Sequence, residues 1–117
     1  MFETELEVRQ SDINDNLWEL TAELVYASQH RDHIRVPKGF ITDFASVPRL
    51  PFAYLLFGGI AQRPAVIHDF LYSTPTAKRK WADDILLEAM EAVGVSWFQR
   101  YNIYWAVRAF GASHKKK

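Results

Sequence analysis

The chain has 117 residues, and 49% of them are hydrophobic. It contains no cysteine and has a formal net charge of zero. This length predicts one domain, and the hydrophobic content excludes a disordered chain. The absence of cysteine excludes disulfides and thiolate metal sites. A balanced charge creates no field that would draw the protein to nucleic acid, so we expect no nucleic-acid partner.

The N-terminal residues 1–5 are acidic and alternating, which is unlike a signal peptide. The longest apolar run, around residues 52–57, is far too short to cross a membrane. We therefore expect a protein that is made in the cytoplasm and has no transmembrane segment.

Alternating apolar and polar residues predict an antiparallel β meander over residues 2–36. The alternation covers residues 2–9, resumes over 18–26 after a cluster of turn-forming residues, and predicts a third short strand over 33–36. Short polar connections between consecutive strands are typical of a meander with one face in water.

The pattern changes over residues 37–60, which have no clean period. Polar residues, Asp43 and Ser46 among them, lie between apolar ones, which predicts an irregular loop that holds polar groups inward. Residues 51–57 predict a short helix that ends at a glycine pair. Asp43 and Ser46 either stabilise turns of this loop through their side chains or contribute to a site.

A helical part is predicted over residues 61–111. Pro64 suits the first turn of a helix that runs to about Tyr72. A second helix is predicted over residues 77–93, with Gly94 as its C-terminal cap.

A third helix is predicted to begin after a capping box formed by Ser96 and Gln99 and to end at Gly111. Apolar residues nearly encircle this helix, so we expect it to pack on two sides. Residues 112–117 form a basic tail. Because strands come first and helices follow, the sequence predicts a single α+β domain over residues 1–117.

The most unusual stretch is the apolar run 66–72, in which His68 and Asp69 lie side by side. Tyr72 follows three to four positions later, so on a helix it lies near both polar side chains. Burying an imidazole and a carboxylate is costly unless both have partners. The stretch is therefore either a functional site or the centre of a buried hydrogen-bond network.

A partner for this stretch is predicted on the second helix. The apolar stripe of that helix runs through Leu86 and Met90 and includes Asp83, whereas the neighbouring Asp84 falls on the polar face. The second helix follows the first after a short break and would run antiparallel to it. We therefore expect Asp83 to reach His68.

Two interpretations of these residues stay open. In the catalytic one, Asp83 fixes the tautomer of His68, whose other ring nitrogen acts as a general base toward water. Asp69 would then be free to hold a hard cation such as calcium together with backbone carbonyls and water. In the structural one, His68 and Asp83 form a satisfied buried pair, Asp69 caps loop amides and Tyr72 simply packs.

From Val36 onward the chain resembles a small family catalogued as domain of unknown function 1353, which is found in tailed bacteriophages and prophages. The blocks that carry the resemblance are, in order, VPKGFITDFASVPR (36–49), IHDFLY (67–72), WAD (81–83) and AVRAFG (106–111). This resemblance implies a phage origin and brings no established activity.

The segment 68–72 is also similar to the His-Asp-x-x-Tyr helix motif of phospholipase A2 enzymes, including the compact versions on parvovirus capsid proteins. The similarity implies that His68 is the base and that Asp69 is a calcium ligand. It also implies that Asp83 is the orienting acid and that Tyr72 supports it.

Together these features favour a metal-assisted hydrolase of an envelope component, a lipid ester or a cell-wall bond, used in phage entry or lysis. The alternative is a non-enzymatic virion protein, a tail or head accessory, in which the same residues form a buried hydrogen-bond network. Such a protein would be made in the host cytoplasm, be incorporated in the virion, and contact other virion proteins or further copies of itself. A small intracellular protein that binds a host factor is a third alternative.

Overall fold

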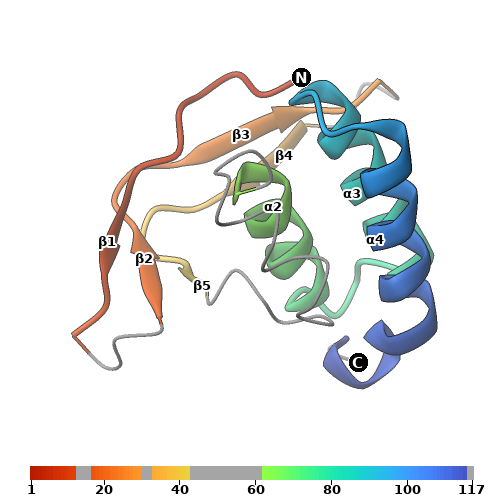
Figure 1. Cartoon of the computed structure of the whole chain (residues 1–117). Coiled ribbons are helices and arrows are strands. Elements are labelled where there is room, and N and C mark those ends of the chain that lie inside the picture. The colour runs from red at the N-terminus through yellow and green to blue at the C-terminus, as the bar shows by residue number, and fades with distance from the viewer. Residues whose placement is uncertain (13–16, 30–32, 43–61, 116–117) are drawn as a thin grey trace.

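The computed structural model describes residues 1–12, 17–29, 33–42 and 62–115. Antiparallel strands are followed by three helices, which confirms the predicted α+β class (Figure 1). The strands are β1 (Val8–Gln10), β2 (Trp18–Leu20), β3 (Leu24–Ala27), β4 (His33–Val36) and β5 (Ile41–Thr42). The helices are α2 (Gln62–Tyr72), α3 (Arg79–Ala92) and α4 (Trp97–Phe110), followed by a 3-10 turn, η1 (Gly111–His114).

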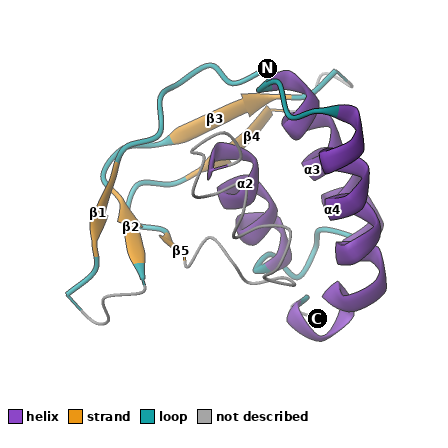
Figure 2. Cartoon of the chain, viewed as in Figure 1, coloured by secondary structure: helices purple, strands orange, loops and turns teal. Residues whose placement is uncertain are grey.

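The strands form two antiparallel units, the three-stranded sheet β1-β2-β5 and the pair β3-β4 (Figure 2). The strand predicted over residues 18–26 is divided, because the chain bends over residues 21–23 and passes from β2 in one sheet to β3 in the other. Of the strand predicted over residues 2–9, only its end lies in β1, and Phe2 forms an isolated bridge with Tyr26.

The short strand β5 pairs with β2, opposite Trp18 and Glu19. It falls at the start of the stretch 37–60, for which the sequence predicts an irregular loop. The rest of that stretch, with Asp43, Ser46 and the predicted short helix, lies outside the described residues.

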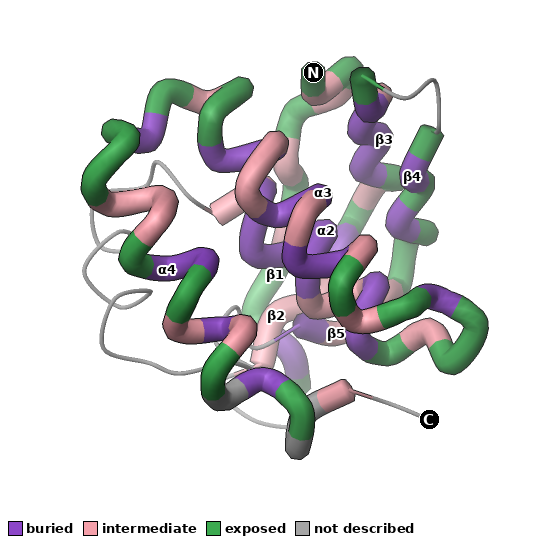
Figure 3. The backbone as a smooth tube through the Cα atoms, turned by 90° about the vertical axis from the view of Figure 1, so that its right-hand side faces the viewer, coloured by how far each residue is buried: buried purple, intermediate pink, exposed green. Residues whose placement is uncertain are grey.

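The first helix, α2, contacts strands β4 and β5 as well as α3, and α3 in turn packs on α4 (Figure 1). Buried residues gather where these elements meet (Figure 3). The core includes Leu20, Leu24 and Tyr26 from the strands, Ile67 and Leu71 from α2, and Leu86 and Met90 from α3. Helix α2 is therefore enclosed between the strands and the other two helices.

The helix ends lie at the predicted caps or next to them, because the C-cap of α3 is Val93 and the predicted Gly94 follows it. The Gln99 backbone N–H donates to the Ser96 hydroxyl at the start of α4, at 3.3 Å. Gly94 follows α3 with a φ of +88°, a conformation that favours glycine. Gly111 is the C-cap of α4.

The expectation that α4 packs on two sides is wrong. Its inner side buries Ile103 and Val107, but Trp97, Phe98 and Trp105 are 64–70% exposed. The physical reason is position, because α4 lies at the edge of the helical layer and α3 covers only one side of it. Within the described ranges, no helix is long and apolar enough to span a membrane.

The carboxylate of Glu88 joins α3 to the end of β3. The Tyr26 hydroxyl donates to the Glu88 carboxylate at 2.5 Å, and the Gln29 backbone N–H donates to the same oxygen at 3.1 Å. Burial and the neighbouring Glu88 raise the pKa of Tyr26 above its usual range, so the phenol stays a proton donor. Glu88 lies one helical turn after Asp84, on the face predicted to be polar, but the structure brings it against the end of β3.

Candidate functional site

The candidate site is centred on the carboxylate of Asp83 in α3, which is completely buried. Its neighbour Asp84 has a side chain that is 46% exposed and binds Lys80 at 2.7 Å. The helical stripe therefore distinguishes the two acids as predicted.

His68 and Tyr72 both contact one oxygen of this carboxylate. The distance from His68 Nε2 to Asp83 Oδ1 is 2.8 Å, and the Tyr72 hydroxyl donates to the same oxygen at 2.6 Å. The two rings lie one helical turn apart on α2, with their centroids separated by 4.1 Å. The expected contact between the first and second helices is present.

The second carboxylate oxygen is held by an arginine that the sequence analysis did not single out. Arg108 of α4 donates to Asp83 Oδ2 at 2.9 Å, while Arg79 lies 3.9 Å from the same oxygen. Arg79 in turn donates to the backbone carbonyl of Arg108 at the end of α4. Arg108 lies within the block AVRAFG, which was the available signal, but helical periodicity alone does not reveal its partner.

These contacts set the charge of the site. Burial would raise the pKa of Asp83, but hydrogen bonds from His68, Tyr72 and Arg108 outweigh it and hold the pKa below its usual range. Burial and the Asp83 carboxylate raise the pKa of Tyr72, so its hydroxyl stays protonated. Asp83 is thus an ionised acceptor surrounded by donors from α2 and α4.

Gly111 explains how the end of α4 approaches this network. A Cβ atom at this position would lie 2.6 Å from the Tyr72 hydroxyl oxygen. The backbone φ of Gly111 is −79°, which any residue can adopt. The requirement for glycine is therefore steric, and the three atoms nearest to the added Cβ all belong to Tyr72.

Asp69 contacts strand β5, whereas the adjacent His68 contacts α3. The Thr42 hydroxyl of β5 donates to Asp69 Oδ2 at 2.6 Å. Calcium takes about six to eight oxygen ligands, and in the described part of the chain no group of three or more His, Asp or Glu side chains is placed to hold a metal ion. Within the described residues, a calcium ion at Asp69 would therefore need backbone carbonyls and water for its other ligands.

Replacing Asp83 by Asn should strongly destabilise the protein. The substitution leaves buried donors without an ionised acceptor, which costs about 3–5 kcal/mol of unfolding free energy. The matched change Asp84→Asn, one residue away at a partly exposed position, should cost less than about 1 kcal/mol. Urea denaturation of both variants measures the difference, and equal losses would contradict the central role of Asp83.

The contribution of Asp83 to the unfolding free energy should depend on pH. The pKa of Asp83 is lower in the folded chain than in the unfolded chain. Its stabilisation is therefore complete above the unfolded value of about 4 and is lost as the pH falls toward the folded value. The unfolding free energy of the wild type should fall on acidification more steeply than that of Asp83→Asn. Parallel curves would contradict the shift.

Replacing Gly111 by Ala should push the Tyr72 hydroxyl away from Asp83 and cost about 1–3 kcal/mol. Adding Tyr72→Phe removes the oxygen that clashes, so the double variant should lose less than the sum of the two single losses. Gly94→Ala, where nothing lies within 4 Å of the added Cβ, should be additive with Tyr72→Phe. Denaturant unfolding of these five variants and the wild type would reveal the coupling, and additivity at Gly111 would refute the steric explanation.

Comparisons with known proteins place the chain in a family. No curated protein and no solved structure matches it. A family profile described as "Protein of unknown function (DUF1353)" matches residues 18–107, a range that includes His68, Asp69, Tyr72 and Asp83. The chain belongs to the DUF1353 family.

Proposed function

We propose that the chain is a bacteriophage protein that hydrolyses an envelope component, a lipid ester or a cell-wall bond, with His68 as general base. The phage origin is inferred from the resemblance of the four sequence blocks, and the chemistry is inferred from the site. Entry and lysis are the stages at which a phage needs such an activity.

The observation that supports this function is the 2.8 Å contact between His68 Nε2 and Asp83. Because Asp83 is ionised, it can only accept a hydrogen bond, so Nε2 carries the proton. In neutral His68 the lone pair is then on Nδ1, which is the nitrogen that can take a proton from water. Tyr72 and Arg108 hold the carboxylate in the position that maintains this tautomer.

Calcium enters the proposal only through Asp69. The similarity to phospholipase A2 enzymes implies that this residue contacts calcium, and its bond to Thr42 orients the carboxylate toward β5. When bound, calcium would polarise a carbonyl or phosphoryl oxygen of the substrate.

A specific observation favours the second candidate, a non-enzymatic virion protein. His68 is only 1% exposed, and every described partner of Asp83 comes from α2, α3 or α4. A fully satisfied network of this kind connects the three helices and can serve architecture alone. In that case the protein would be found among the components of the virion.

Replacing His68 by Asn should abolish hydrolysis, because it removes the general base. A loss of about 10²- to 10⁴-fold in kcat is expected, with KM little changed. Suitable substrates are 4-nitrophenyl butyrate, phosphatidylglycerol vesicles and purified peptidoglycan, and circular dichroism checks that the variant is folded. Asp84→Asn is the matched control and should retain full activity.

The outcome also separates the two candidate functions. A wild-type protein inactive on all three substrates, or a folded His68→Asn variant with unchanged kcat, would overturn the hydrolase. Two results would instead support the structural candidate. Mass spectrometry would detect the protein in purified virions, and His68→Asn would lower the unfolding free energy by several kcal/mol.

Calcium binding should be visible as a shift in thermal stability. Millimolar calcium should raise the Tm of the wild type relative to EDTA, because a ligand that binds only the folded state stabilises it. Asp69→Asn should show a smaller rise or none, and Asp12→Asn, at an exposed position far from α2 in sequence, is the control. An unchanged wild-type Tm would remove calcium from the proposal.

A further inference from the structure

The outer side of α4 exposes a group of aromatic side chains. Of the large hydrophobic residues that the structure describes, only Met1, Trp97, Phe98 and Trp105 are exposed, the last three by 64–70%. These three aromatic residues lie on the side of α4 that α3 does not cover (Figure 1). Large apolar side chains grouped on one face indicate an interaction surface.

This surface carries no charge. The described residues that line a hollow of about 250 Å³ on it are all uncharged: Trp97, Phe98, Tyr101, Asn102 and Trp105. Both arginines of α4 have partners within the chain, since Arg100 donates to the Val95 carbonyl and Arg108 donates to Asp83. Nucleic acids and anionic membranes are bound through cations, so neither fits this face. The partner surface must itself be uncharged and largely apolar.

The spacing of the exposed residues matches that of paired helices. Phe98, Asn102, Trp105 and Ala109 are all exposed and follow one another at intervals of four, three and four. This is the seam spacing of two helices that pack along their length. In an antiparallel pair of identical helices, the first seam position of one copy lies opposite the last of the other, and the second lies opposite the third. Phe98 would therefore face Ala109, so that a large side chain meets a small one.

The two inner seam positions match chemically. The Asn102 side-chain N–H donates to the Phe98 carbonyl of its own helix at 3.0 Å, which leaves the side-chain oxygen of Asn102 to accept. The indole N–H of Trp105 can only donate, and a buried indole usually finds an acceptor. In the antiparallel pair, Trp105 of each copy lies opposite Asn102 of the other. The twofold axis therefore provides this donor and acceptor pair twice.

The hollow on α4 fits the same arrangement. Phe98, Tyr101, Asn102 and Trp105 stand at positions i, i+3, i+4 and i+7, the four positions that form a hole for one side chain of a facing helix. In the antiparallel register, the side chain opposite the middle of this hole is Trp105 of the second copy. Each copy thus provides a hole and the side chain that fills the hole of the other.

The exposed area is enough for a weak dimer. Complete burial removes about 150–250 Å² of a Trp or Phe from water, so the exposed parts of Trp97, Phe98 and Trp105 amount to about 300–500 Å² per copy. A specific interface buries about 1,200 Å² or more in total, counted over both partners. The aromatic residues of two copies supply half of this area or more, and the rest of the seam adds to it.

We propose that the chain forms a symmetric dimer through antiparallel packing of two α4 helices, in which Trp105 of each copy fills the hollow of the other and donates to its Asn102. This dimer is separate from the hydrolytic function and does not rest on it.

Sedimentation of the full chain from micromolar to millimolar concentration tests the dimer. The wild type should change from monomer to dimer over this range, and Trp105→Ala should weaken the association by about tenfold or more. Because Trp105 is exposed in the monomer, this variant should keep its fold, which circular dichroism checks. Ala92→Glu, at an exposed position of α3, is the control and should dimerise like the wild type.

A charge pair then tests the register. Ala109→Glu alone should weaken the dimer, because it places a carboxylate against Phe98 of the second copy. Adding Phe98→Lys to the same chain should restore part of the association, since each lysine then faces a glutamate of the other copy. In a parallel pair, the glutamates would face each other and no recovery would occur.

Four results would overturn the proposal. They are a wild type that stays monomeric at millimolar concentration, a dimer unaffected by Trp105→Ala, and a double variant that associates no better than Ala109→Glu. The fourth is a monomer whose tryptophan fluorescence shifts to the blue on phosphatidylcholine vesicles, because the occupant of this face would then be a lipid surface.

Discussion

The buried negative charge of Asp83 is the constraint on which the helical half depends. An ionised carboxylate cannot be removed from water unless donors replace its hydration. Here the donors come from α2 through His68 and Tyr72, and from α4 through Arg108. Because each donor sits on a different turn or helix, satisfying one carboxylate fixes how both helices lie against α3. The close approach of Gly111 to Tyr72 follows from the same requirement.

Much of this site could be predicted from local sequence, and the missing part is non-local. The 3.6-residue period distinguishes Asp83 from Asp84, and the i,i+4 spacing brings His68 and Tyr72 together. The caps at Gly94 and Ser96 could likewise be recognised from residues within a few positions. Arg108 is 25 residues from Asp83, so its role depends on how α4 crosses α3, which no periodicity specifies. For Arg108 the pattern missed a contact that exists, whereas for Trp105 it predicted a contact that the described chain does not make. An apolar pattern on α4 does not tell whether another element covers that side of the helix.

The strands show a second limit of pattern reading. Apolar and polar residues alternate from Trp18 to Glu23, whereas β3 buries three consecutive apolar residues, Leu24, Val25 and Tyr26. The chain nevertheless changes sheet within that run, and period 2 is unaffected when a strand bends and pairs with a new partner. Thr42 gives a related example. Its two-residue strand is too short to produce a pattern, yet it positions the hydroxyl that binds Asp69.

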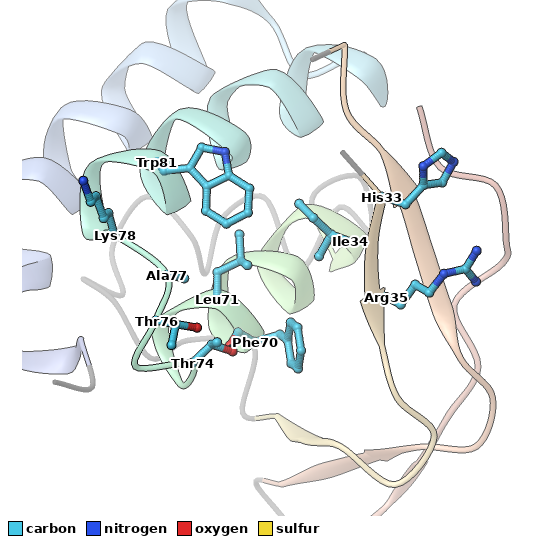
Figure 4. Close-up of a pocket in the computed structure, with 10 residues that line it drawn as sticks. All are labelled: His33, Ile34, Arg35, Phe70, Leu71, Thr74, Thr76, Ala77, Lys78 and Trp81. Atoms are coloured by element: carbon cyan, nitrogen blue, oxygen red, sulfur yellow. The ribbon is translucent and has the colours of Figure 1, made fainter. Parts of the chain in front are cut away.

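Helix α2 presents three kinds of side chain in three directions. His68 faces α3, Asp69 faces β5, and Phe70 and Leu71 face a groove of about 630 Å³ beside β4 (Figure 4). The contacts of Asp83 with its donors and the groove beside β4 therefore lie on different sides of the same helix.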